Sequence, residues 1–345
     1  MQIIVAILVF SFIIFFHELG HFLLARANDV KVNEFAIGMG PKLLAWTKGE
    51  TTYCLKLLPF GGSCSMEGED EESSDERAFN KKNNWQKFLI VFAGPFFNFL
   101  LAFILAVILL IAAGYNPAVV EDVIDGYPAQ EAGIEAGDEI IRMGGYNVHF
   151  YNEIGIYSLF HQNETFDVTY IRDGQKYTTT VTPKLDEETG RYLIGVSGNT
   201  IVRRTGFFST IAYGFYEIKY QIYVVLNSLK MLFTGGLSIN DLSGPVGIVK
   251  SMGDTYNQAA QISVISVILT MMNYAVLLSA NLGVMNLLPI PALDGGRILI
   301  YIIEGITRRK IPENVEGAIN LAGFVLLMLL MVFVMGNDIK KIIAP

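Results

Sequence analysis

Residues 1–25 read MQIIVAILVFSFIIFFHELGHFLLA. This stretch is mostly apolar and long enough to cross a bilayer as one helix, which takes about 20 residues. It nevertheless contains His17, Glu18 and His21. An ionisable side chain in a lipid-embedded helix costs roughly 2.5–3.5 kcal/mol, so three of them within one turn indicate a shared purpose. The charges lie at the far end of the apolar run and no basic residue precedes it, so we expect a retained helix rather than a signal peptide.

The spacing of the HELGH sequence suits a metal site. Side chains four apart lie one turn above each other on a helix, so His17 and His21 can reach one ion while Glu18 points beside it. A catalytic zinc takes three protein ligands and lowers the pKa of a water to about 7, and a nearby carboxylate can take the proton. We therefore expect two metal ligands and a general base. The alternative is a pair of core histidines satisfied by hydrogen bonds to their neighbours.

The composition also indicates a membrane protein. Of 345 residues, 52% are hydrophobic and 17% charged, and such a length allows a helical bundle with one or two small soluble modules. The formal net charge of −8 argues against nucleic acid as a partner. Cys54 and Cys64 are the only cysteines and lack the C-x-x-C spacing, so we expect two unpaired residues.

Three further apolar runs follow, from Phe88 to Ala113, Ile262 to Leu288 and Ile319 to Met335. The stretch from Phe207 to Phe233 has a similar length but contains Glu217, Lys219, Lys230 and four tyrosines. We expect this stretch to be an amphipathic helix lying at the membrane surface. The predicted fold is therefore an α-helical multi-pass membrane protein with about four transmembrane helices.

The third run leads into NLLPIPALDGG, residues 286–296. Two prolines break the helix and two glycines follow, which is how a membrane chain opens its backbone beside a cavity and directs a carboxylate inward. Asp294 is the most plausible third metal ligand, and the alternative is a plain turn. To meet His17 and His21 it must lie at the same depth and on the same side of the membrane, which requires that 207–233 does not span.

Basic residues indicate the sidedness. Nine lie between the first two runs, and four lie between the last two: Arg26, Lys31, Lys42, Lys48, Lys56, Arg77, Lys81, Lys82 and Lys87, then Arg297, Arg308, Arg309 and Lys310. The positive-inside rule places both loops, and the metal end of the first helix, at the cytoplasmic face. Residues 114–206 then lie outside. Lys340 and Lys341 would also be external, a mild violation of the rule.

These motifs together resemble the site-2 protease family of intramembrane zinc proteases, in its bacterial RseP/RasP-like branch. The resemblance covers nearly the whole chain and rests on five segments: HELGH, GMGP at 38–41, GPFFNF at 94–99, SGPVGI at 243–248 and the stretch from Asn286 to Gly295. It implies that His17, His21 and Asp294 bind Zn²⁺ and that Glu18 activates water. It also implies that Asn286 holds the substrate or polarises its carbonyl, although Asn286 could simply pack the bundle, and Asn281 could share either role.

Between Val32 and Met66 the pattern becomes strand-like, and we expect two hairpins at or partly within the membrane surface. A strand edge can hold an extended substrate by pairing with it, and the resemblance implies this role for such an element. The candidate substrate-binding residues are Leu55, Lys56, Leu57, Leu58, Pro59, Phe60, Gly61 and Gly62. The alternative is a hairpin that only braces the bundle. The acidic run 67–77 is expected to be a bare, solvated loop.

Residues 114–185 resemble one PDZ domain, because 128–141 read PAQEAGIEAGDEII and Asp173-Gly174 joins two strand patterns. Met143-Gly144-Gly145 departs from the usual pattern and leaves the ligand preference open. The predicted organisation is therefore two helices with the hairpin region at about 31–66 (1–113), an extracytoplasmic PDZ domain (114–185), a segment with the surface helix (186–260) and two further helices (261–345). The domain could take a ligand peptide or the stub of an ectodomain.

The predicted enzyme is a zinc metalloendopeptidase in the bacterial cytoplasmic membrane that performs regulated intramembrane proteolysis. Its substrates would be transmembrane segments of single-pass proteins whose outer domain has already been trimmed, such as anti-sigma factors or remnant signal peptides; this substrate class is implied by the resemblance alone. Two alternatives stay open at this point: an inactive membrane PDZ scaffold, disfavoured by the intact Glu18, and a metal transporter, which would want further acidic or histidine residues in other spans.

Overall fold

The structure of the chain is a computed structural model, and it describes residues 2–69, 73–198, 200–236 and 243–343. The chain divides into two compact units. The first comprises Met1–Leu105 and Ser238–Pro345, and the second comprises Ala106–Leu237. The first unit contains both the HELGH sequence and Asp294.

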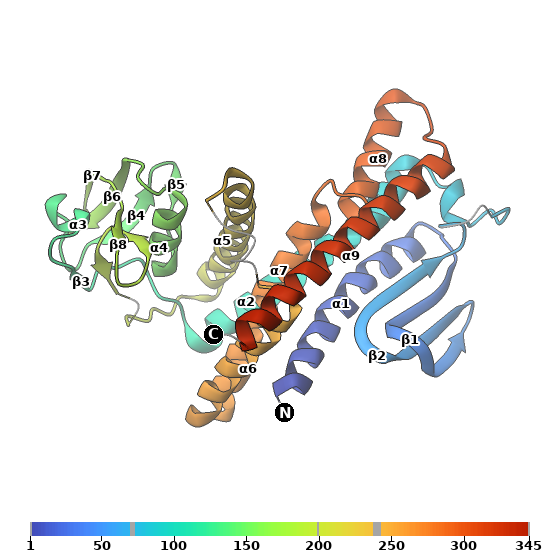
Figure 1. The fold of residues 1–345 in the computed structure, drawn as a ribbon, viewed down its shortest axis with the longest axis horizontal. Coiled ribbons are helices and arrows are strands. Elements are labelled where there is room, and N and C mark those ends of the chain that lie inside the picture. The colour runs from blue at the N-terminus through green and yellow to red at the C-terminus, as the bar shows by residue number, and fades with distance from the viewer. Residues whose placement is uncertain (1, 70–72, 199, 237–242, 344–345) are drawn as a thin grey trace. The chain divides into compact units, whose positions relative to one another are not determined.

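Long helices dominate the first unit (Figure 1). Their bounds are α1 (Gln2–Ala27), α2 (Asn84–Ala113), α7 (Val264–Leu287) and α9 (Glu313–Ile343), the last turns of α2 belonging to the second unit. Among the described helices, these four are long and apolar enough to cross a membrane, α9 over Val315–Ile343. The four runs expected from the sequence are therefore confirmed as helices of spanning length.

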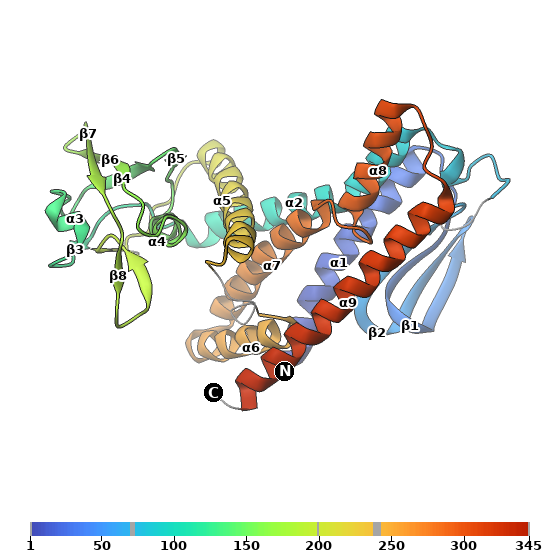
Figure 2. The ribbon, with the colours of Figure 1, turned by 45° about the horizontal axis from the view of Figure 1, so that its top comes forward.

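Two shorter helices lie at opposite ends of this bundle, α6 (Pro245–Ile262) and α8 (Asp294–Thr307) (Figures 1 and 2). The start of α6 explains the SGPVGI sequence. The carboxylate of Asp338 in α9 accepts hydrogen bonds from the backbone N–H groups of Gly244 and Gly247 at 3.1 and 2.8 Å. Built Cβ atoms at these glycines would lie 2.8 and 3.0 Å from that carboxylate, so glycine permits the approach.

The β-rich part of the first unit is one hairpin, β1 (Val32–Lys48) with β2 (Thr51–Met66), and the expectation of two hairpins is corrected. Each strand is bent, so that the first part of β1 pairs with two separate parts of β2. Ile37 therefore pairs with both Leu55 and Gly62. The bends occur at Gly38 (φ +88°) and Gly61 (φ +78°), a conformation that costs glycine nothing.

This folding leaves two free edges in the sheet. Residues 33–37 lie between 62–66 and 52–55, and residues 44–48 lie beyond 52–55. One edge is therefore formed by 62–66 and the other by 44–48. The hairpin packs against α1, and Figure 2 shows its two strands alongside that helix. Both cysteines lie in β2, buried and unpaired as expected.

The second unit is built around a four-stranded antiparallel sheet of order β5-β4-β6-β7. Its elements are β3 (Asp122–Val123), α3 (Pro128–Glu131), β4 (Glu139–Met143), β5 (Tyr146–Asn147), α4 (Tyr151–Phe160), β6 (Phe166–Arg172), β7 (Gln175–Val181), β8 (Lys184–Asp186), β9 (Arg191–Leu193) and β10 (Val196–Ser197). Asp173 and Gly174 form the β6–β7 turn, as expected. Strand pairing continues past residue 185, because β10 pairs with β3.

Helix α5 (Phe207–Thr234) belongs to this second unit and is not among the helices apolar enough to span. Its tyrosines pack on the domain. Tyr213 lies 4.0 Å from Tyr115, and Tyr223 lies 4.3 Å from Tyr146, measured between ring centroids. Other positions of the helix carry exposed apolar residues, including Phe208 and Phe233. The tyrosines of this helix therefore face protein, and its position at the membrane surface stays a prediction.

Candidate metal centre

The two histidines of α1 face α2 at a point where both helices carry a glycine. A Cβ built at Gly20 would lie 2.3 Å from the carbonyl oxygen of Ala93, so this glycine lets α2 approach α1. A Cβ built at Gly94 would lie 2.3 Å from Nε2 of His21 and 2.8 Å from Cε1 of His17. Gly94 therefore makes the room in which both imidazoles stand.

Asp294 reaches the same point from the other side, at the start of α8. Helix α7 ends at Leu287, and the following prolines stop it from continuing. Ala292 then adopts φ +70°, and its N–H donates to Oδ1 of Asn320 in α9 at 3.4 Å. Gly295 lies so close to the carbonyl of Leu288 that a built Cβ would be 2.2 Å from it. This tight return directs Asp294 toward α1.

Three ligand atoms converge at this point. Nε2 of His17 lies 3.2 Å from Nε2 of His21 and 3.2 Å from Oδ2 of Asp294, and Nε2 of His21 lies 3.6 Å from the same oxygen. Tetrahedral zinc with bonds of about 2.0–2.2 Å sets its ligand atoms roughly 3.3–3.6 Å apart. The triangle therefore has the size that zinc requires. Oδ2 of Asp294 is also buried, and the two imidazole nitrogens lie 3.2 and 3.6 Å from it.

The outer nitrogens of both imidazoles face α2. Nδ1 of His21 lies 2.9 Å from the carbonyl oxygen of Ile90, and Nδ1 of His17 lies 3.0 Å from Nδ2 of Asn98. Pro95 loosens α2 here, since a proline removes one helical hydrogen bond and crowds the carbonyl four residues earlier. Burial raises the pKa of Asp294, but the two imidazoles outweigh it and hold that pKa below its usual range.

Glu18 lines the same cavity of about 290 Å³. One wall is the sheet edge: Ser63, Cys64, Ser65 and Met66 of β2 all face the cavity. Next to them, a Cβ built at Gly62 would lie 2.8 Å from Cγ of Glu18. The strand edge, the carboxylate of Glu18 and the candidate metal ligands therefore all line one cavity.

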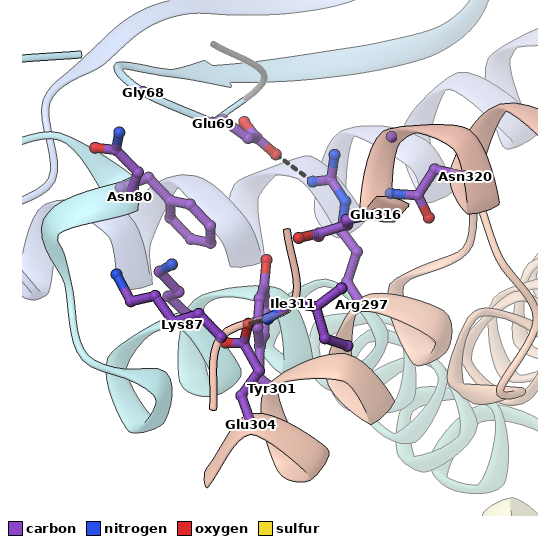
Figure 3. A pocket seen from close by; sticks show the side chains of 13 residues that line it. Gly68, Glu69, Asn80, Lys87, Arg297, Tyr301, Glu304, Ile311, Glu316 and Asn320 are labelled. Carbon is purple, nitrogen blue, oxygen red and sulfur yellow. Dashed lines mark hydrogen bonds and ion pairs between the residues drawn. The ribbon is translucent and has the colours of Figure 1, made fainter. Parts of the chain in front are cut away.

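A second, polar cavity of about 170 Å³ adjoins the first, and Glu69 and Arg297 line both. Figure 3 shows their ion pair, with Nη1 of Arg297 2.5 Å from Oε1 of Glu69. Glu69 follows β2, and Arg297 lies in the first turn of α8. The acidic run is thus not bare: Glu67 also accepts from Asn33 at 2.9 Å. Asp70, Glu71 and Glu72 lie outside the described residues.

The expected substrate-binding residues are distributed along the hairpin, and among them Gly62 lies where a built Cβ would meet Cγ of Glu18. Leu55 pairs inside the sheet, while Leu57 and Leu58 are exposed farther along β2. Lys56 is bound to Glu34 at 2.8 Å, and Gly61 forms the bend. The side chains of Pro59 and Phe60 lie outside the described part of the chain. Asn286 and Asn281 are half-buried in α7 and do not line the metal cavity.

The sequence predicted that small residues around Gly94 permit close helix approach and that Asn98 can hydrogen-bond across the helix interface, and both are confirmed; that they meet the histidines, and the contributions of Ile90 and Glu69, went beyond the prediction. Asn98 had a signal, since a polar residue in an apolar run between small residues indicates a hydrogen bond across helices. The carbonyl of Ile90 had none, because backbone groups carry no residue identity.

A sequence model described as peptidase family M50 matches residues 5–330. The chain belongs to this family. The resemblance to the site-2 proteases is thereby confirmed, and proteases of family M50 act on protein substrates. The match spans α1 to α9 and so includes both HELGH and Asp294.

Similar M50 proteins cover the whole chain. A putative zinc metalloprotease of Clostridium acetobutylicum is 40% identical over 100% of this chain and 98% of its own. The zinc metalloprotease RasP of Bacillus licheniformis is 31% identical over 99% of both chains. Both relatives are named zinc metalloproteases, which agrees with the prediction that this chain binds Zn²⁺. A solved PDZ domain of an SdrC-like protein of Listeria monocytogenes matches 24% of this chain and 88% of its own at 22% identity, with a TM-score of 0.22 that is too low to support a fold argument.

Proposed function

We propose that the chain is an intramembrane zinc metalloendopeptidase, with His17, His21 and Asp294 as the zinc ligands. The observation that carries this proposal is the convergence of their three ligand atoms within 3.6 Å, with Glu18 in the same cavity. All three come from the ends of helices long enough to span, or from the turn directly after one. A structural zinc site has four protein ligands and needs no base, whereas three ligands beside a carboxylate suit catalysis.

The chain's own residues then divide the reaction among them. Zinc, when bound, would act as a Lewis acid that polarises a carbonyl group and lowers the pKa of a water molecule to about 7. Glu18 takes a proton from the attacking water and returns it to the leaving amine.

The edge 62–66 is proposed to hold the substrate in extended form. A peptide bond within a helix is shielded by its own turns, so the segment must be drawn out before hydrolysis. Among the described strands, none pairs with the outer side of 62–66 beside Glu18, so one substrate strand could add there in antiparallel pairing. The residues of β2 nearest to Glu18 are 62–66, so we extend the earlier candidate 55–62 toward Met66.

The wider setting is proposed on the charge distribution and the fold. The chain would lie in the bacterial cytoplasmic membrane with the metal centre near the cytoplasmic face. Residues 114–185, with the strands that follow, would form an external PDZ domain that takes a peptide or an ectodomain stub. Single-pass proteins already trimmed outside, such as anti-sigma factors or remnant signal peptides, are the proposed substrates.

The experiment follows cleavage of a tagged single-pass substrate by the purified full-length protein. Glu18→Gln should reduce the rate by at least about 100-fold, and a zinc chelator should abolish it reversibly. Glu69→Gln is the matched control, because this acid lines the same cavity but is paired with Arg297, and it should retain far more activity. Equal cleavage by wild type and Glu18→Gln, or insensitivity to chelation, would refute the proposal.

A further inference from the structure

Asn98 is the side chain that contacts the outer nitrogen of His17. It is fully buried in α2, and its Nδ2 lies 3.0 Å from Nδ1 of His17. Nε2 of the same ring points into the ligand triangle. One ring nitrogen of His17 therefore faces the proposed metal position, and the other contacts Asn98. The partner of one nitrogen thus limits where the proton of the ring can sit.

A neutral imidazole carries a single N–H. If Nε2 binds a metal, the proton must be on Nδ1, and Nδ1 is then a donor that needs an acceptor. The amide nitrogen of Asn98 is a donor only. With that nitrogen facing Nδ1, the proton of His17 would sit on Nε2, inside the ligand triangle. This arrangement is incompatible with metal binding through Nε2.

Rotation of the terminal amide removes the conflict. The amide has nearly the same shape in both orientations, and its oxygen and nitrogen are assigned from their partners. Oδ1 of Asn98 is buried and has no hydrogen-bond donor within the described part of the chain. Turning the amide by half a rotation brings this oxygen to Nδ1 of His17 without changing the packing.

His21 shows the same requirement met by the backbone. Its Nδ1 lies 2.9 Å from the carbonyl oxygen of Ile90, a group that can only accept. That contact fixes the proton of His21 on Nδ1 and leaves Nε2 free for a metal. Ile90 and Asn98 lie on the same helix, and both present an oxygen to an imidazole if the amide is turned. Thus α2 would supply one acceptor to each histidine.

We propose that Asn98 is a positioning residue whose side-chain oxygen accepts from Nδ1 of His17 and so holds this ligand in the tautomer and orientation that bind zinc. The inference rests on the proposed function for the ligand set. Asn98 does not touch the reacting atoms; it acts through His17. Its backbone carbonyl accepts from the hydroxyl of Ser279 at 2.8 Å, an interaction that does not involve the side chain.

The test measures zinc affinity of the full-length protein in detergent by competition with a chelating dye. Asn98→Leu has a similar volume and no acceptor, and it should bind zinc about 10–100-fold more weakly. Asn98→Asp keeps acceptors but has no donor, and its affinity should stay within about threefold of wild type or increase. Ser279→Ala is the control for loosening at the same turn of α2, and it should change affinity by less than about threefold.

Two results would overturn the inference: unchanged affinity in Asn98→Leu, or equal losses in Asn98→Leu and a folded Asn98→Asp. If Asn98→Asp fails to fold, the visible spectrum of bound Co²⁺ replaces it as the second measurement. Asn98→Leu should then alter the ligand-field bands that wild type and Ser279→Ala share, and an unaltered spectrum would also reject the role. A wild-type protein that binds no zinc would instead refute the proposed function itself.

Discussion

Gly94 sets the space between α2 and the two imidazoles, and its replacement gives a clear prediction. Alanine favours a helix by roughly 1 kcal/mol over glycine, but here its Cβ would lie 2.3 Å from Nε2 of His21. One ring or the helix must move by a large part of an ångström, and a displacement of that size costs about 100-fold in rate. We expect Gly94→Ala to lose zinc affinity and about that much cleavage.

The control for this prediction is Gly336→Ala in α9. A Cβ at Gly336 would meet nothing within 4 Å, so the same substitution in another apolar helix should leave cleavage and zinc content near wild type. Zinc content is measured by elemental analysis and cleavage with the tagged substrate. Normal zinc content and activity in Gly94→Ala would show that α2 can retreat without consequence.

His149 provides a pH prediction in the second unit. Its ring stacks on Tyr216, with centroids 3.7 Å apart. Burial first, and then the charge of Lys219, lower its pKa to about 4, whereas an unfolded histidine has a pKa of about 6.5. Between these values the unfolded state binds more protons, so the stability of this unit should fall as the pH decreases from 6.5 toward 4.

Limited proteolysis of the full chain at pH 7.5 and pH 5.0 measures this effect as cleavage within residues 106–237. We expect cleavage to become severalfold faster at pH 5.0. Glu153 also faces His149, at 4.0 Å, and burial raises its pKa, which acts in the opposite direction. His149→Phe keeps the stacking and removes the proton site, so its acceleration should be smaller. An identical acceleration in both proteins would assign the effect to other groups.

The sequence could predict that the candidate metal ligands His17, His21 and Asp294 meet at one point, because their spacing encodes geometry; their roles as ligands, and that of Glu18 as base, stay proposals. Positions four apart on a helix fix the two histidines, and the prolines before Asp294 indicate an opened backbone. It could not predict Gly94, Asn98 and Ile90 as neighbours of those rings, since the rotation of α2 about its own axis is set by packing. Glu69 was missed because an acidic run is usually solvated.

At the level of single elements, Asp338 fixes the start of α6. It is buried, and both of its oxygens accept backbone N–H groups at the first turn of that helix, where a negative charge is favoured. Asp338→Ala leaves two donors without their acceptor, that of Gly244 buried and that of Gly247 partly buried, and an unsatisfied buried donor costs about 1–3 kcal/mol. We expect a lower thermal midpoint in detergent and faster proteolysis within α6.

Asp338→Asn keeps one carbonyl oxygen for the two donors, and it should lose less stability than Asp338→Ala. Ile339→Ala, at the neighbouring exposed position of α9, serves as a control for the substitution itself. If Asp338→Ala unfolds at the wild-type temperature, the contact with α6 contributes nothing measurable.

The hairpin explains why elements were predicted better than their arrangement. Alternation and glycines located the strands, but a bent strand that pairs on both sides has the same local pattern as two separate hairpins. The choice depends on long-range contacts of β1 with both halves of β2, which carry no local signature. In α5, the composition indicates an amphipathic helix, but it does not indicate that the tyrosines pack against the adjacent domain.

At the level of the whole molecule, the metal centre constrains the path of the chain through the membrane. His17 and His21 lie in the last three turns of α1, and Asp294 follows the end of α7. Their ligand atoms meet, so α1 and α7 must run in the same direction and α2 in the opposite one. If the four long helices span the membrane as proposed, the chain makes no net crossing between the end of α2 and the start of α7.

This constraint predicts the location of α5, which lies between those helices. A single crossing by α5 would deliver Asp294 to the wrong side of the membrane, so both ends of α5 should be external. A reporter active only outside the cytoplasm should give signal when inserted after Thr234 and equally in the β6–β7 turn at Gly174. Inserted between α8 and α9 at Arg309, it should be silent, because that basic loop is cytoplasmic under the positive-inside rule. Silence at Thr234 with signal at Gly174 would mean that α5 crosses, and the shared depth of His17 and Asp294 would then require a second, compensating crossing by α6.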